Sequence, residues 1–226
     1  SSNPNATSTS PATNNYNFIQ QLYLNGTYSI AQYNTDNWLY PQTITATNGQ
    51  QTPTITGLGT FSIAQGLIIS ITTVLYFSAS AFSGLGTLSI SNELIITANT
   101  TLSTSTVSGS GTLSIASGKT LTQSSAMTVS ISNISVAGTW SQGATITISN
   151  SNISVSGTWA NAGYSITVPS GSTVSWKVTG SITTGSTAGT LTVDGTCYWI
   201  GSGITASTSN AQATFTLTLA GTGIFI

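Results

Sequence analysis

Apolar and polar residues alternate one by one along much of the chain. In residues 128–131, 145–148 and 214–219, Ile, Val, Leu or Phe occupies every second position, and Thr or Ser occupies the positions between. A period of two is that of a β-strand with one buried face. The strong helix formers Glu, Lys and Arg are nearly absent, while β-branched residues and Gly abound. The pattern predicts an all-β protein.

A Gly-Thr step recurs between the alternating stretches. Seven of these steps, lying 19 to 32 residues apart, begin at Gly59, Gly86, Gly111, Gly138, Gly157, Gly189 and Gly221. Repetition on this scale is typical of β-solenoids, in which each coil buries its inner face against its neighbours. Glycine also suits corners that need a positive φ. We therefore predict a β-solenoid of stacked coils.

One nine-residue segment occurs twice with a single difference, as SNISVAGTW at residues 132–140 and SNISVSGTW at residues 151–159. Because Trp140 and Trp159 take equivalent places in this duplication, we expect them to stack in the core rather than form a sugar-binding platform. The unequal intervals between Gly-Thr steps leave an alternative open. The same strands could be the hairpins of a β-sandwich or jelly roll, a pilin-like head completed by a donor strand.

Composition divides the chain into three parts. Residues 1–15 are a polar leader, residues 16–50 are a strand region rich in Tyr, and residues 51–226 are a repetitive β domain rich in Ser, Thr and Gly. The second part places an apolar stripe on one side of an extended strand, made of Phe18, Leu22, Leu24, Tyr28 and Ile30. This stripe is either the first strand of the domain itself or a donor strand that completes a neighbouring subunit's sheet by β-augmentation.

The surface of this chain must be almost uncharged. Ser and Thr make up 80 of the 226 residues, and charged residues only 2%, against about 25% in ordinary soluble domains. Such a surface has neither the basic patch that nucleic acid requires nor the Lys/Arg cluster that anionic lipid attracts. No apolar run reaches the roughly 18 residues of a membrane span. We expect no nucleic-acid partner and no membrane insertion.

Little chemistry remains in this composition. The chain has no His, which excludes Ser-His-Asp triads and His-based metal sites and proton relays. It has one cysteine, Cys197, and lacks the Asp series of calcium-binding β-rolls. Three carboxylates, Asp36, Glu93 and Asp194, are scattered, whereas a glycosidase needs two that face each other across a sugar. We expect no catalysis, no cofactor and no metal.

Threonine pairs spaced two apart could form a flat face of the kind found on ice-binding solenoids. They occur at residues 43 and 45, 54 and 56, 120 and 122, 145 and 147, and 190 and 192. A flat face requires such pairs to stack in register, coil on coil. Their irregular spacing argues against that arrangement.

Five N-x-[S/T] sequons point to glycosylation, at Asn5, Asn25, Asn99, Asn133 and Asn152. The chain begins at Ser1 in a polar leader, as a chain does after removal of a secretion signal. We expect an extracellular glycoprotein, in which glycans provide the hydration that charge does not. With so few ionisable groups, stability should hardly change between about pH 2 and pH 8.

A Ser/Thr-rich, almost uncharged, sequon-bearing β-protein with an apolar N-terminal strand resembles the thread-like extracellular filament subunits of thermoacidophilic archaea. The resemblance is compositional and covers the whole chain. It implies a head-to-tail polymer in which the N-terminal strand, matching about residues 16–33, inserts into the β head of the next subunit, with glycans outside. The heads of that family resemble pilin sandwiches, so the Gly-Thr repeats depart from its pattern.

These observations together predict a structural subunit of a secreted, glycosylated cell-surface filament or pilus, a homopolymer that serves adhesion or biofilm cohesion. One alternative is a monomeric β-solenoid adhesin or ice-binding module. A second alternative is a carbohydrate-active enzyme that uses Asp36, Glu93 or Asp194.

Overall fold

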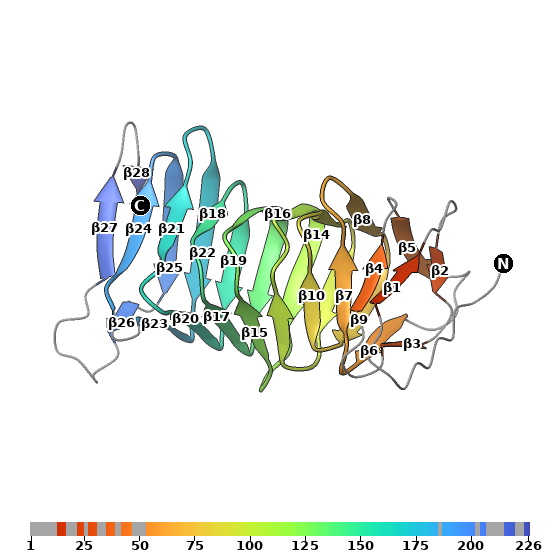
Figure 1. Cartoon of the computed structure of the whole chain (residues 1–226). Helices are drawn as coiled ribbons and strands as arrows, with labels where there is room; N and C mark the ends of the chain where they lie inside the picture. The colour runs from red at the N-terminus through yellow and green to blue at the C-terminus, as the bar shows by residue number, and fades with distance from the viewer. Residues whose placement is uncertain are drawn as a thin grey trace.

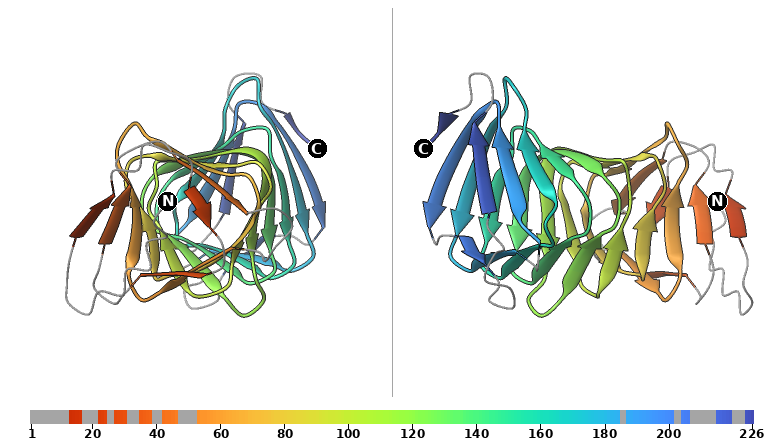
Figure 2. Two further views of the ribbon diagram at one scale, coloured as in Figure 1. Left: turned by 90° about the vertical axis from the view of Figure 1, so that its right-hand side faces the viewer. Right: turned by 60° about the vertical axis from the view of Figure 1, so that its left-hand side comes forward.

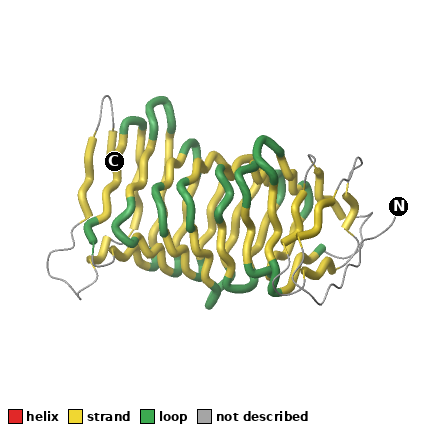
Figure 3. Tube along the Cα trace, in the orientation of Figure 1, coloured by secondary structure: helices red, strands yellow, loops and turns green. Residues whose placement is uncertain are grey.

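The protein is a rod of stacked β-coils (Figure 1). The computed structural model describes residues 13–16, 22–24, 27–30, 35–38, 42–46, 53–184, 187–201, 204–206, 215–219 and 224–226. All regular structure in these residues is β-strand, as Figure 3 shows. None of them forms a helix long and apolar enough to cross a membrane. The predictions of an all-β protein and of a β-solenoid are confirmed.

Three strands make one coil, and each strand pairs in parallel with its counterparts in the neighbouring coils. The first face of the rod, face 1, is a ten-stranded sheet. Its strands are β1 (Thr13–Tyr16), β4 (Thr35–Trp38), β7 (Thr60–Ile63), β10 (Ala81–Ser83), β13 (Thr100–Leu102), β15 (Thr120–Gln123), β17 (Thr139–Gln142), β20 (Thr158–Asn161), β23 (Ser181–Thr184) and β26 (Ile204–Ala206).

The remaining strands form an 18-stranded sheet with two flanks, face 2 and face 3. Face 2 contains β2 (Leu22–Leu24), β5 (Gln42–Ala46), β8 (Ile68–Ile71), β11 (Thr87–Ile90), β18 (Ile146–Ile148), β21 (Ser165–Val168), β24 (Gly189–Val193) and β27 (Phe215–Leu219). Face 3 contains β3 (Thr27–Ile30), β6 (Thr54–Gly57), β9 (Val74–Ser78), β12 (Glu93–Ile96), β19 (Asn152–Val155), β22 (Thr173–Val178), β25 (Thr196–Gly201) and β28 (Ile224–Phe225).

Two long strands join the flanks, β14 (Thr106–Ile115) and β16 (Met127–Val136). The first half of each lies on face 2 and the second half on face 3, and their pairing shifts register between Gly109 and Thr112. Seen along the rod, the coils enclose a common interior (Figure 2). Every strand pairing among the described residues is parallel. The β-sandwich alternative is therefore wrong, because its hairpins and Greek-key corners pair antiparallel strands.

The core consists of inward-facing ladders that run from coil to coil. On face 2, for example, one ladder joins Ile69, Leu88, Val107 and Val129, none of which has exposed surface. The outward positions between them hold Ser and Thr. The alternation in the sequence thus sorts side chains between interior and solvent, and burial of the apolar ladders stabilises each coil only through its neighbours.

Gly-Thr steps mark corners of all three faces, which explains their unequal spacing. The steps at Gly59, Gly86 and Gly111 lead into face 1, face 2 and face 3 respectively. At such a corner the backbone passes directly over the coil before it. A Cβ atom on Gly157 would collide with the carbonyl oxygen of Gly138 one coil earlier. The sequence repeat therefore follows the sides of the coil and not only whole coils; the step at Gly221 lies outside the described residues.

The N-terminal strand region predicted at residues 16–50 contributes strands to the same three faces. β2 pairs in parallel with β5, and β3 pairs in parallel with β6. Leu22, Leu24, Tyr28 and Ile30 therefore belong to strands that pair within their own chain. Phe18 lies outside the described residues. Exchange of this segment with a second subunit stays a prediction.

Candidate functional site

A ladder of seven threonines follows the outer side of face 2. Each occupies the outward position of its strand and is the register partner of the next. The ladder consists of Thr87, Thr106, Thr128, Thr147, Thr167, Thr192 and Thr218. All seven are partly or fully exposed, and neighbouring strands lie about 4.8 Å apart. Face 2 therefore presents the same hydroxyl and methyl group at regular intervals along the rod.

Shorter columns of hydroxyl groups flank this threonine ladder. On one side, Ser70, Ser89, Ser108 and Ser130 are successive register partners. On the other side, Ser165 and Thr190 are register partners in the later coils. In those later coils the face carries complete pairs two residues apart, such as Thr190 and Thr192.

On face 2 the irregular spacing does not prevent single threonines of these pairs from stacking in register, in contrast to the expectation. Thr147 and Thr192 belong to the same ladder although they are separated by two coils of unequal length, because the extra residues lie in corners and loops. The pairs at residues 54 and 56 and at residues 120 and 122 lie on face 3 and face 1 instead. Only some of the pairs therefore contribute to one surface.

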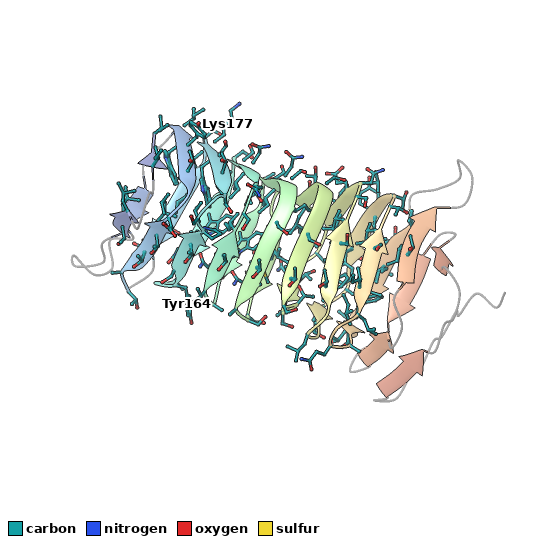
Figure 4. All side chains as sticks on the ribbon, turned by 90° about the horizontal axis from the view of Figure 1, so that it is seen from above. Tyr164 and Lys177 are labelled. Carbon is teal, nitrogen blue, oxygen red and sulfur yellow. The ribbon has the colours of Figure 1, made fainter. Side chains whose placement is uncertain are left out.

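A shallow hollow lies on face 3, between the outer side chains of β16, β19, β22 and β25. Its lining includes Asn133, Asn152, Lys177 and Ile200. Asn133 and Asn152 are register partners on adjoining strands, and both are exposed. Lys177, one of the two cationic side chains of the sequence, projects from the rod in the same region (Figure 4). The hollow offers amides, hydroxyl groups and one ammonium group.

The predicted glycosylation sites have different surroundings. Asn133 and Asn152 stand on the flat of face 3, whereas the exposed Asn99 lies at a corner. There its Oδ1 accepts a hydrogen bond from the backbone N–H of Thr120 in the next coil, at 3.0 Å. Because this bond uses the Oδ1 atom, it does not involve the Nδ2 atom, to which the sugar of an N-linked glycan is attached. Asn5 and Asn25 lie outside the described residues.

The carboxylates are not gathered into one site. The Oε1 atom of Glu93 accepts a hydrogen bond of 2.6 Å from the hydroxyl of Ser114 on face 3. Asp194 precedes β25, five strand spacings from β12, or roughly 24 Å at the usual separation. That exceeds the roughly 5–10 Å between the paired carboxyl groups of glycosidases. Asp36 belongs to β4 on face 1. Across the described residues, no three His, Cys, Asp or Glu side chains cluster as metal ligands.

Four of the five tryptophans form a stack inside the rod. The ring centroids of Trp140 and Trp159 lie 4.6 Å apart, and the two ring planes are nearly parallel, at 3°. Trp176 meets Trp159 edge-on and is in turn stacked on Trp199. Trp140, Trp159 and Trp176 are buried. The prediction that the duplicated tryptophans are core aromatics is confirmed, so they are not available as a surface platform.

A ladder of buried amides accompanies this stack, and it was not among the features predicted from the sequence. Gln123, Gln142 and Asn161 are successive inward-facing register partners with no exposed surface. The Nε2 atom of Gln142 donates to the carbonyl oxygens of Ala144 and Ser165, both at 3.1 Å. Its Oε1 accepts from Trp159 Nε1 at 3.1 Å and from Asn161 Nδ2 at 3.0 Å. The signal was present, because an amide follows each duplicated tryptophan by two residues.

Cys197 is the one titratable side chain that the structure places deep in the described core. It has no exposed surface, and burial raises the pKa of its thiol from 9.0 to about 11. A thiol of this kind is protonated at neutral pH and behaves as a small apolar side chain.

The candidate sites are thus repetitive outer surfaces rather than a cleft with converging reactive groups. A β-solenoid of this kind is consistent with a structural or adhesin-like protein. No protein-family model, no curated protein and no solved structure matches the chain.

Proposed function

We propose that this chain is the structural subunit of a secreted, glycosylated filament that is built from copies of itself and serves adhesion or cohesion between cells. The observation that carries the proposal is the threonine ladder of face 2. It repeats one small polar and apolar group over seven consecutive strands. A surface of this kind makes many equal, weak contacts with another flat or repetitive surface, and such contacts add up through multivalency.

The near absence of charge supports the same proposal. Rods that carry a large net charge of one sign repel each other, whereas this chain has a formal net charge of −1. Rods of this composition can therefore lie side by side with their hydroxyl-covered faces in contact. Glycans at the exposed asparagines would limit that association and keep the filaments hydrated.

Electron microscopy of the secreted material and of the purified full-length chain, at acidic and at neutral pH, tests the filament proposal. We expect long filaments of uniform width at both pH values, because almost no group titrates between them. Monodisperse short rods in both preparations would contradict the proposal.

Peptide mass mapping of the native protein tests the glycan component. We expect sugar at Asn99 and at the pair formed by Asn133 and Asn152. Because the members of this pair are register partners about 4.8 Å apart, two glycans would collide, and most chains should carry one sugar at the pair. Unmodified asparagine at all three positions would remove glycosylation from the proposal and leave the filament untouched.

A monomeric module that binds ice through face 2 is the second candidate function. The register of Thr147, Thr167 and Thr192 favours it, because a flat threonine array can order water along its length. Thermal hysteresis of the purified chain is the direct measurement. Thr147→Lys with Thr167→Lys should abolish the activity, while Thr139→Lys with Thr158→Lys on face 1 should leave it intact. A wild-type chain without thermal hysteresis excludes this candidate.

A further inference from the structure

The core ladders of the rod continue into its last coil, where their residues are exposed. In β24, Leu191 and Val193 have 1% and 0% of their surface exposed. Their register partners in β27 are Leu217 and Leu219, with 44% and 55% exposed. The same alternation thus faces these leucines toward the rod axis, in a coil that has one neighbour among the described residues. Exposed leucines of this kind form an apolar end surface rather than scattered surface residues.

The outermost described strands at the two ends of the rod have complementary edges that no other described strand covers. Among the described residues, β26, β27 and β28 pair with β23, β24 and β25. At the other end, β1, β2 and β3 pair with β4, β5 and β6. All of these pairings are parallel. The uncovered strand edge at one end is therefore the kind of edge that the uncovered strands at the other end would pair with. A second copy placed along the axis would meet the first with strands in the same direction on all three faces.

Neither end carries the charges with which proteins commonly protect exposed sheet edges. The first charged side chain in the sequence is that of Asp36, in the second coil, and the last is that of Asp194, which precedes β25. The strands of the first and last coils contain none. The two ends therefore match in charge, and no buried ion would oppose their contact.

We propose that the C-terminal coil of one copy stacks on the N-terminal coil of a second copy, so that β26, β27 and β28 continue in parallel into β1, β2 and β3 of the next chain. The occupant of the exposed end is thus a second copy of this protein. The contact extends the coil-to-coil interface that already exists between every pair of coils inside the chain. It is head-to-tail and does not close on itself, which is the symmetry of an open filament. The inference rests on the proposed filament function and identifies the contact between successive subunits, here called the joint.

Paired substitutions test the joint in the full-length chain. Leu217→Lys and Leu219→Lys each place a charge at the core side of the end surface, whereas Thr183→Lys places the same charge on the outer side of face 1, away from both the end surface and the threonine ladder. We expect the two leucine variants to weaken association at least tenfold by sedimentation velocity and to lack filaments in micrographs. Thr183→Lys should assemble like the wild type.

The monomers of the leucine variants should keep the wild-type circular dichroism, because both leucines are already half exposed in a single chain. Wild-type polymerisation by both leucine variants would overturn the inference. Failure of the wild-type chain itself to form filaments would instead contradict the proposed function, so the two failures are distinguishable.

A disulfide lock separates end-to-end stacking from exchange of the N-terminal strand. Tyr23 and Thr45 are register partners in β2 and β5, and paired strands lie within the Cα separation that a disulfide spans. In the variant Tyr23→Cys with Thr45→Cys, oxidation before assembly ties β2 to its own chain. We expect the oxidised and reduced forms to make filaments equally well. If only the reduced form polymerises, strand exchange makes the joint and the stacking inference is wrong.

Discussion

The interior of face 1 changes its chemistry halfway along the rod. One inward ladder contains Phe61, Phe82 and Leu102, and the same ladder continues with Gln123 and Gln142. In the early coils the phenyl rings of Phe61 and Phe82 pack with centroids 4.9 Å apart. In the later coils each amide bonds to backbone carbonyls and to a neighbouring tryptophan or amide.

The two halves hold neighbouring coils together by different interactions. Apolar burial is non-directional, so the phenyl half tolerates small displacements between coils. Hydrogen bonds have strict distances and angles, so the amide half defines where each coil lies on the next. The rod therefore combines a half held by packing with a half held in register.

Among the substitutions that test this contrast, replacement of Gln142 should lower the free energy of unfolding the most. Gln142→Leu keeps a similar volume but removes the side-chain partner of Trp159 Nε1 and of the Ser165 carbonyl. The Ala144 carbonyl keeps its bond from Gln123, and Asn161 Nδ2 keeps its bond to the Tyr164 carbonyl. At about 1–3 kcal/mol for each of the two groups left unsatisfied, we expect a loss of about 4 kcal/mol in the free energy of unfolding. Denaturant titration measures it. Unchanged stability would mean that the amide ladder does not contribute to holding the coils.

The reverse exchange, Leu102→Gln, places an amide in the apolar half. Leu102 is buried between Phe82 and Gln123 on the ladder. We expect a loss of about 2–3 kcal/mol, since an amide buried without full hydrogen bonding costs this much in proteins. If the variant is as stable as the wild type, the amide ladder can extend toward the N-terminal coils. The boundary between the two halves is then not fixed by packing.

The two stacked tryptophans offer a finer comparison within the amide half. Trp159 Nε1 donates to Gln142 at 3.1 Å, whereas Trp140 Nε1 lies 3.5 Å from the Oε1 atom of Gln123. Replacement by Phe removes the indole N–H from each. Trp159→Phe should cost about 1 kcal/mol more than Trp140→Phe, the net value of one hydrogen bond. Equal losses would show that stacking alone determines the contribution of both rings.

At the C-terminal end of the ladder, a substitution should increase the free energy of unfolding instead of lowering it. Thr184 follows Asn161 as its register partner and is fully buried, and its hydroxyl has no hydrogen-bond partner in the structure as described. Thr184→Val keeps the shape and removes an unsatisfied polar group. We expect a gain of about 1 kcal/mol. A loss of stability would show that the hydroxyl has a partner in solution.

Alkaline pH should have the smallest of these effects, a loss of stability in the later coils only. Cys197 lies in the later coils, and burial raises the pKa of its thiol from 9.0 to about 11. The folded state disfavours the thiolate, so this contribution to stability is complete below about pH 9 and is lost as the pH rises toward 11. Amide exchange in β25 should therefore accelerate above pH 9 in the wild type more than in Cys197→Ala. Equal acceleration in both would contradict this linkage.

Much of the fold could be predicted because it depends on local periodicity. Alternation of apolar and hydroxyl residues distinguishes the inner from the outer side of each strand, and the duplicated segment places Trp140 on Trp159 with no further information. Register over longer distances could not be predicted. The ladder from Thr147 to Thr192 depends on which corners absorb the extra residues of the longer coils, and that is decided by packing between coils.

The amide ladder escaped prediction for a related reason. Gln and Asn are common at solvent-facing positions, and their burial becomes favourable only when carbonyls of two coils come within reach of the same amide. That condition concerns neighbouring coils, and a single strand does not reveal it. Gln142 and Asn161 could be recognised from sequence only by comparing equivalent positions after the duplicated tryptophans.

The direction of the strand pairing also determines how the rod would respond to tension. The hydrogen bonds between coils run along the rod axis, so a pull on the two ends loads them one coil after another, in the manner of a zipper. Each opened coil of about 20 residues would release roughly 70 Å of extended chain. A rod loaded in this way lengthens in steps instead of breaking at once, and it can dissipate the work of a pull while most of its coils remain folded.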